Sequence, residues 1–146
     1  MQSVRELIAH KGSTVHSVPV SATVLEAAQV MNEARIGAVV VLDEGAMVGI
    51  LTERDILTRV VAAERAPSRT LVSQVMTREV LTCAPETRIG EARHVMRERR
   101  VRHLPVVDRG QLLGMLSIGD LNLVENETLV ETIRHMEAYI SGEVSL

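Results

Sequence analysis

The chain has 146 residues, 46% of them hydrophobic, which is enough for one compact domain or for two small halves that share a core. Its net charge of −3, with both signs interspersed, argues against nucleic acid as a partner, and no apolar run is long enough for a membrane-spanning helix. The single cysteine, Cys83, excludes an internal disulfide, and the absence of a signal-peptide pattern then predicts a cytoplasmic protein.

The first half of the chain predicts two helices that flank a β-hairpin. A short helix at residues 4–10 and an extended run at 14–18 come first, and Thr23 and Glu26 then form a capping box at the start of a longer helix. Apolar, β-branched runs at 38–42 and 46–51 are joined by an Asp-Glu-Gly turn, which is typical of a hairpin. The next helix is expected from Thr52 to about Arg65.

The second half repeats this order with an offset of 65 residues. The match includes Glu26, Asp43, Gly45, Gly49 and Asp55, which recur as Glu91, Asp108, Gly110, Gly114 and Asp120. A long unit that occurs twice indicates a pseudo-two-fold pair rather than a solenoid. We therefore divide the chain into residues 1–66, the N-terminal helix and first repeat, and 67–146, the second repeat and C-terminal helix.

The C-terminal segment lies outside the repeat. A short helix after Asp120 is expected to give way near Asn126 to a longer one, on which Leu129, Ile133, Met136 and Ile140 form a narrow apolar stripe before Gly142. Together with the helix at 4–10, this segment is interpreted either as a cover for the two repeats or as the contact of a homodimer.

Each repeat ends its hairpin at a junction that offers a hydroxyl and, one turn later, a carboxylate. Thr52 with Asp55, and Ser117 with Asp120, stand where a strand gives way to a helix. The hydroxyl and the free amides of a helix start can face a phosphate, and a carboxylate can accept both hydroxyls of a ribose. Gly49 and Gly114, just before the junctions, would admit a close ligand. The same Thr/Ser-x-x-Asp spacing also predicts an ordinary helix cap, and the two roles can coexist.

Two motifs carry a resemblance that covers nearly the whole chain. The segments 49–55, GILTERD, and 114–120, GMLSIGD, together with 102–108, RHLPVVD, are similar to the cystathionine-β-synthase (CBS) repeat of bacterial stand-alone CBS pairs, or Bateman modules. The resemblance implies an α/β (α+β) fold of two β-α-β-β-α repeats related by a pseudo-two-fold axis, plus terminal helices. It also implies a regulatory module, with adenine nucleotide as ligand: AMP first, and ATP, ADP or NAD(H) as alternatives.

The resemblance further implies two clefts between the halves. Their nucleotide-binding residues are expected to be Ser17, Val18, Gly37, Ala38, Val39, Thr52, Arg54, Asp55, Thr82, Cys83, Ala84, Arg102, His103, Leu104, Pro105, Ser117, Ile118 and Asp120. Backbone groups would read the adenine edge, and Val and Leu side chains would cover its faces, because the chain has no Phe or Trp to stack on them. Arg54 and Arg102 are the expected phosphate contacts, and since Gly119 is the counterpart of Arg54, the two sites are expected to differ in affinity. Arg97, Arg99 and Arg100 are interpreted as a helix end that complements its dipole.

Two other classes of function remain open in the sequence. An enzyme is disfavoured, because the five histidines lack metal-ligand spacing and no Gly-x-Ser-x-Gly elbow is present. Cys83 with His103 is the one candidate nucleophile–base pair, and we expect no catalytic residues, catalytic cofactor or metal. A ligand-free dimerisation or docking domain is the alternative. With no output domain in the chain, any signal would pass in trans to a protein partner that the sequence does not identify.

Overall fold

The structure is a computed structural model that describes residues 2–142. Its first half contains α1 (Val4–Lys11), β1 (Ser17–Pro19), α2 (Val24–Ala34), β2 (Ala38–Asp43), β3 (Ala46–Thr52) and α3 (Glu53–Ile56), which continues into a π-helical turn (Leu57–Val61). After a 3-10 turn (Pro67–Arg69), the second half contains α4 (Val72–Val75), α5 (Ile89–Arg99), β4 (His103–Asp108), β5 (Gln111–Ser117) and α6 (Ile118–Ser141). The predicted helix over 52–65 is thus present, but its second half is π-helix and turn.

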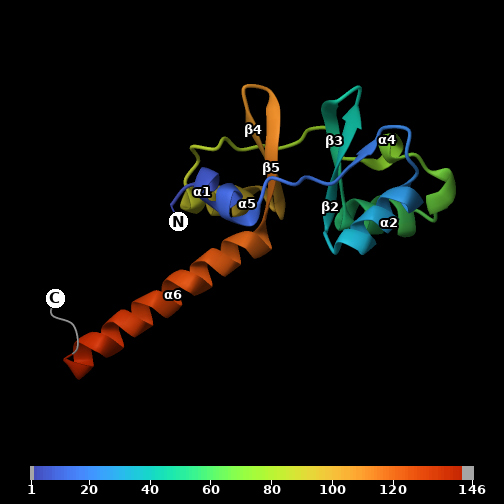
Figure 1. Ribbon diagram of the computed structural model, residues 1–146. Coiled ribbons are helices and arrows are strands. Elements are labelled where there is room, and N and C mark those ends of the chain that lie inside the picture. The colour runs from blue at the N-terminus through green and yellow to red at the C-terminus, as the bar shows by residue number, and fades with distance from the viewer. Residues whose placement is uncertain (1, 143–146) are drawn as a thin grey trace.

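The two hairpins match each other in detail and stand side by side (Figure 1). Both β2–β3 and β4–β5 are antiparallel, and each has a register shift at the same place in the repeat, after Val41 and after Val106. In both turns the two central residues have positive φ, which is the geometry of a type I′ turn. β1 pairs in parallel with β2, whereas its counterpart in the second half is a single bridge from Cys83 to Val106. The predicted fold of two α/β repeats is confirmed.

The hydrophobic cores do not follow the order of the chain. The core under β2 and β3 includes Val72, Val75 and Met76, from α4 and the residue after it, at the start of the second half. The core under β4 and β5 includes Val4 and Leu7 of α1, at the start of the first half. Each half is therefore closed by the N-terminal segment of the other half. α1 is a cover, which was one of the two interpretations of the terminal helices.

Gly49 and Gly114 are the points where these covering segments approach the sheets. A Cβ at Gly49 would lie 2.6 Å from the sulfur of Met76 and 2.9 Å from the carbonyl oxygen of Thr77. A Cβ at Gly114 would lie 2.8 Å from Cδ1 of Ile8. The close approach that the sequence predicts at both glycines is thus made by the protein itself rather than by a ligand.

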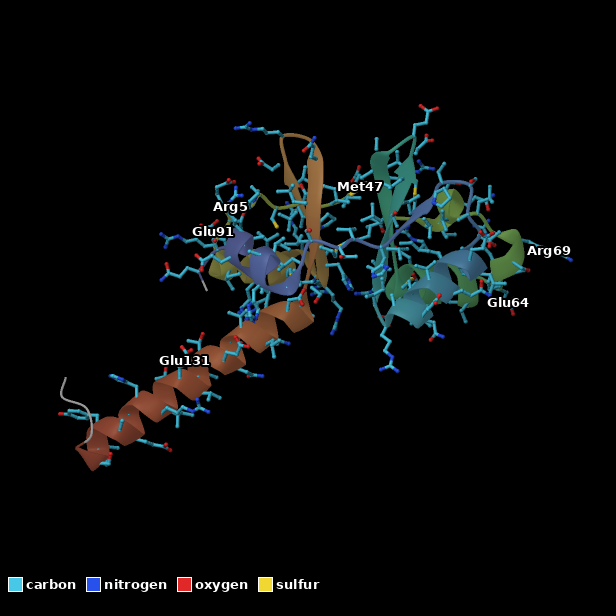
Figure 2. All side chains as sticks on the ribbon, viewed as in Figure 1. Arg5, Met47, Glu64, Arg69, Glu91 and Glu131 are labelled. Atoms are coloured by element: carbon cyan, nitrogen blue, oxygen red, sulfur yellow. The ribbon has the colours of Figure 1, made fainter. Side chains whose placement is uncertain are left out.

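α6 is a single helix of 24 residues, so the predicted break near Asn126 is wrong. No Gly or Pro lies between Asp120 and Ser141, and the helix therefore continues until Gly142 adopts the left-handed conformation at its C-cap. Leu121 and Val124 pack into the second core, but the later turns project away from the body of the molecule, with side chains such as Glu131 extending into solvent (Figures 1 and 2).

Candidate functional site

A cleft of about 470 Å³ lies between the two halves, at the point where β3 passes into α3. One wall is the first junction, another is the segment 77–81, and the third is the segment 100–103 that leads into β4. The lining residues are Gly37, Ile50, Thr52, Glu53, Arg54, Asp55, Thr77, Glu79, Val80, Leu81, Arg100, Val101, Arg102 and His103. The volume falls within the range of about 300–1,000 Å³ that is usual for small-molecule sites.

The Asp55 carboxylate is held from two sides at the floor of this cleft. It accepts a hydrogen bond from the Thr52 amide at 3.1 Å, while the Thr52 hydroxyl accepts one from the Asp55 amide at 3.2 Å, so the expected capping box is formed. The Thr77 hydroxyl donates to the carboxylate at 3.1 Å. Asp55 is only 7% exposed. Nε of Arg59 also lies 3.9 Å from Oδ1 of Asp55, beyond hydrogen-bond distance. A carboxylate offers about four acceptor positions, so the two hydrogen-bond donors leave two, which is the number a ribose diol requires.

The second junction has the same cap but a different partner for its carboxylate. Oδ2 of Asp120 accepts from the Ser117 amide at 2.8 Å, from the Ser117 hydroxyl at 2.9 Å and from Nζ of Lys11 at 2.6 Å. The Lys11 ammonium also donates to the carbonyl oxygen of Met115 at 2.5 Å. The covering segment thus brings a hydroxyl to Asp55 but a full positive charge to Asp120, and a ligand at the second junction would have to compete with that ammonium.

The amides that begin α3 and α6 are partly occupied by the chain. Glu53 N donates to the Gly37 carbonyl at 3.0 Å, and the equivalent Ile118 N donates to Arg102 at 2.9 Å. The third amide of each helix, that of Asp55 or Asp120, donates to the cap hydroxyl. Of the first three amides of each helix, the second, that of Arg54 or Gly119, takes part in none of these bonds. A phosphate at these junctions would therefore be bound mainly by side chains.

His103 lies where the two halves meet. Its Cε1 would be 3.2 Å from a Cβ at Gly37, and the Glu53 carboxylate faces the same point. Burial lowers the pKa of His103, and the positive charges of Arg102 and Lys11 lower it further, against the opposing effect of Glu53 and Asp120. The imidazole is thus held in its neutral form, which can both donate and accept a hydrogen bond.

The cleft brings together one part of the expected nucleotide-binding set and leaves the rest elsewhere. Gly37, Thr52, Arg54, Asp55, Arg102 and His103 line it together. Val18, Ala38, Val39, Leu104 and Pro105 are buried, and Ser17, Thr82, Cys83, Ala84, Ser117, Ile118 and Asp120 lie outside the cleft lining. The residues that sequence reasoning missed are chiefly Thr77 and its neighbours 79–81. They sit just after the linker, and no motif marks them.

The candidate nucleophile pair lacks a reactive thiol. Cys83 packs against the second core, and burial raises its pKa to about 11, so the thiolate is scarce at neutral pH. Its backbone is also occupied, because the amide donates to Pro105 and the carbonyl accepts from Val107. Among residues 2–142 no three His, Cys, Asp or Glu side chains are grouped closely enough to hold a metal ion.

Comparison with known proteins agrees with the duplicated fold. The family model described as "CBS domain" matches twice, at residues 4–62 and 72–125. The mitochondrial CBS domain-containing protein CBSX3 of Arabidopsis thaliana is 36% identical over 125 residues, which make up 82% of this chain and 61% of that protein. The chain thus spans less than two thirds of this relative, and a cytoplasmic location stays a prediction. Across the described residues, no helix is long and apolar enough to cross a bilayer.

Two solved structures extend the comparison. A CBS-domain-containing protein from Agrobacterium tumefaciens is 35% identical and superposes with a TM-score of 0.81 over 85% of this chain and 93% of its own. A CBS domain protein from Pyrobaculum aerophilum, complexed with AMP, is 30% identical, with a TM-score of 0.71 over 81% of this chain and 88% of its own.

Proposed function

The chain belongs to the family of CBS-domain proteins, with two copies of the domain, and on that premise we propose that it is a regulatory module whose central cleft binds an adenine nucleotide. The observation that carries the proposal is the cleft itself, where a buried carboxylate, a cap hydroxyl and the side chains of Arg54 and Arg102 line one cavity. The carboxylate suits a ribose diol and the arginines suit a phosphate.

AMP is the nucleotide we propose first. The Pyrobaculum relative was solved with AMP, and the cleft volume of about 470 Å³ suits a ligand of this class. Ile50, Val80 and Val101 supply aliphatic surface in the cleft for the adenine ring. We further propose that the Asp120 junction is a weaker second site, because the Lys11 ammonium already bonds its carboxylate.

Thermal unfolding in the presence of AMP, ADP, ATP, NAD and NADH tests the proposal. A ligand at 100 times its dissociation constant stabilises the native state by about 2.7 kcal/mol, which corresponds to roughly 5–11 °C for a chain of this size. Stabilisation without turnover of the ligand supports the regulatory module. Turnover would indicate an enzyme, and no response to any of the five would favour the ligand-free docking domain.

We also propose that the module is a homodimer that pairs through α6. Leu129, Ile133, Met136 and Ile140 are 54–82% exposed, and their alternating spacing of four and three residues is that of a two-helix seam. Light scattering is expected to give twice the chain mass of 16.0 kDa for the wild type and the monomer mass for Ile133→Glu. Glu131→Gln, on the opposite face of the same helix, is the matched control; a monomeric wild type would refute the pairing. In either state the nucleotide signal would pass to a protein target in trans.

A further inference from the structure

Two further cavities of similar size occupy equivalent positions in the two halves. One, of about 450 Å³, lies between the C-terminal end of α2 and α3, and the other, of about 460 Å³, lies between the C-terminal end of α5 and the start of α6. Seven of the eight residues that line the first have their counterpart, 65 residues later, in the lining of the second: Ala28, Met31, Asn32, Arg35, Ile36, Gly37 and Glu53 correspond to Arg93, Met96, Arg97, Arg100, Val101, Arg102 and Ile118. Because of the duplication, the first cavity can serve as a reference against which the lining residues of the second are compared.

The two cavities differ strongly in charge. The first holds one arginine, Arg35, and one carboxylate, Glu53. The second, which we call the arginine pocket, is lined by Arg54, Arg93, Arg97, Arg100 and Arg102 and by no carboxylate. Of the seven shared positions, three change from a neutral residue to arginine and one changes from glutamate to isoleucine, so every change of charge is toward positive. Arg54 adds a fifth positive charge from the other half of the molecule.

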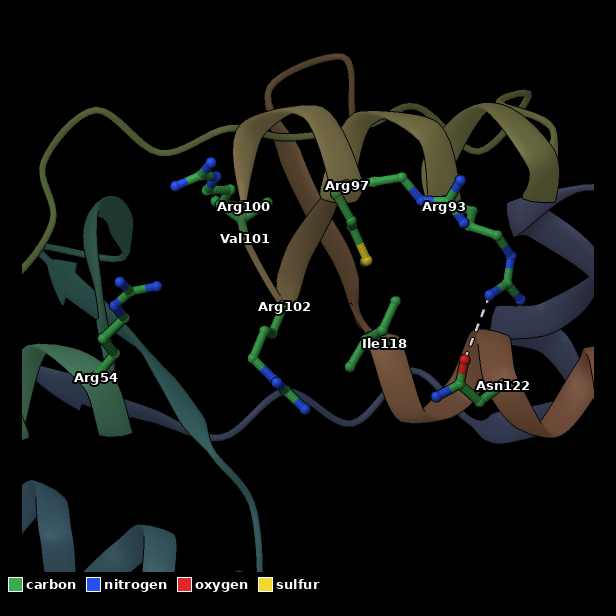
Figure 3. A pocket seen from close by; sticks show the side chains of 9 residues that line it. Arg54, Arg93, Arg97, Arg100, Val101, Arg102, Ile118 and Asn122 are labelled. Atoms are coloured by element: carbon green, nitrogen blue, oxygen red, sulfur yellow. Dashed lines mark hydrogen bonds between the residues drawn. The ribbon is translucent and has the colours of Figure 1, made fainter.

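Within residues 2–142, most of this charge is not neutralised by the protein. Arg93 is held by α6, where it donates to the Leu121 carbonyl at 2.7 Å and lies 3.3 Å from the Glu125 carboxylate. None of the other four arginines of the pocket forms a side-chain hydrogen bond or an ion pair with the described residues. Figure 3 shows that Arg54 comes from one half of the molecule, and Arg100 and Arg102 from the other. A hollow lined by charge of one sign concentrates the field and attracts an ion of the opposite sign. Guanidinium groups favour the oxygens of phosphate, which they bind in pairs.

We propose that the arginine pocket is an oligophosphate-binding site, which takes the phosphate chain of a nucleotide that occupies the neighbouring cleft. The cleft and the pocket share Arg54, Arg100, Val101 and Arg102 in their linings, so they are adjacent. A nucleotide with its ribose at Asp55 meets Arg54 and Arg102 first, and each further phosphate extends toward Arg97. In this form the inference rests on the proposed function and revises its first ligand: AMP still binds in the cleft, but a nucleotide with a longer phosphate chain binds more tightly than AMP.

Calorimetric titration of the full chain in metal-free buffer with AMP, ATP and inorganic triphosphate tests the proposal. Arg97→Asn copies the residue found at the equivalent position of the first cavity, Asn32, and Arg99→Asn removes the same charge from the same helix outside the pocket. We expect ATP to bind at least about tenfold more tightly than AMP, since each added phosphate gains charge-assisted hydrogen bonds. Arg97→Asn is expected to weaken ATP and triphosphate by about 3- to 10-fold and AMP by less than about twofold, because Arg97 is exposed and partly screened. Arg99→Asn is expected to change none of the three, with equal melting temperatures of the two variants as the folding control.

The outcomes separate this inference from the proposed function. If AMP and ATP bind equally and Arg97→Asn is without effect, the pocket does not hold phosphate and the nucleotide module stands. If no nucleotide binds but triphosphate binds and depends on Arg97, the pocket stands and the proposed function is wrong. If Arg97→Asn weakens AMP as much as ATP, or if Arg99→Asn acts as strongly as Arg97→Asn, the selective role of the pocket is refuted.

Discussion

Replacing Asp55 by asparagine tests whether its carboxylate serves a ligand as well as the fold. The carboxylate caps α3 through the Thr52 amide and accepts from the Thr77 hydroxyl, so a loss of binding in a variant that removes the whole side chain can have a structural origin. Asparagine keeps an acceptor for the Thr52 amide and can donate to the Thr77 hydroxyl, and the free energy of unfolding is therefore expected to fall by only about 1 kcal/mol.

The expected loss of affinity follows from the acceptor positions of the carboxylate. Two hydrogen-bond donors of the protein leave two positions, and a ribose diol would fill both. Asparagine cannot accept two further hydrogen bonds there, and hydrogen bonds to a charged acceptor contribute about 1.5–3 kcal/mol. AMP is therefore expected to bind about 10- to 100-fold more weakly to the variant, since 1.4 kcal/mol is a factor of ten.

Titration with an AMP analogue that lacks both ribose hydroxyls completes a double-mutant cycle. The analogue is expected to bind the wild type as weakly as AMP binds the variant, and to bind the variant no worse than the wild type. If the variant weakens the analogue as much as it weakens AMP, Asp55 acts through the fold alone and the ribose assignment is wrong.

Three other perturbations probe the cover segments and the thiol. Lys11→Met is expected to lower the free energy of unfolding by about 1–2 kcal/mol, because a partly buried ion pair loses one partner. It is also expected to raise the calorimetric stoichiometry toward two nucleotides per chain, because Asp120 becomes available. Lys11→Arg, which keeps the charge, is the control. Gly49→Ala is expected to lower the free energy of unfolding, measured in urea, by about 1–3 kcal/mol, because the added Cβ overpacks against Met76 and Thr77. In Gly90→Ala the added Cβ meets nothing within 4 Å, so this control is expected to be neutral or stabilising. Equal effects of the two variants would contradict the role given to the covering segment. Because burial raises the pKa of Cys83 to about 11, its reaction with a disulfide reagent at pH 8 is expected to be about 100-fold slower than that of a free thiol. The rate is expected to keep rising with pH up to about 11, and a free-thiol rate at pH 8 would show that the site is open.

The sequence was sufficient for the repeated fold because the features that define it are local. The helix cap at Thr23 forms as expected, and in the two Asp-x-Gly turns both central residues adopt positive φ, which glycine accepts at the second position. The hairpins follow from the continuous apolar, β-branched runs on either side of each turn. The predicted break near Asn126 is a local error, because the residues around it have uninterrupted helix propensity, and the helix predicted over 52–65 turns π-helical after Ile56.

The candidate site was predictable at the two junctions but not around them. Thr52 with Asp55, and Ser117 with Asp120, form the caps that their spacing indicates. Thr77, which completes the surroundings of Asp55, is 22 residues away in the chain, and Lys11 is 109 residues away from Asp120. Such partners are brought in by the packing of the covering segments, and a contact of that separation leaves no periodic or local pattern to read.

By itself the sequence determined the repeat, its secondary structure and the family, because in-register motifs and local backbone preferences are written along the chain. Only the tertiary structure decided that each half is closed by the N-terminal segment of the other half and that the two carboxylates have different partners. It also decided that arginines from α3, α5 and the approach to β4 line one pocket. The physical reason is that burial and the clustering of charge depend on which distant side chains share a cavity. Each helix end, taken alone, has the sequence of an ordinary solvated helix end, and the pocket exists only where several such ends meet.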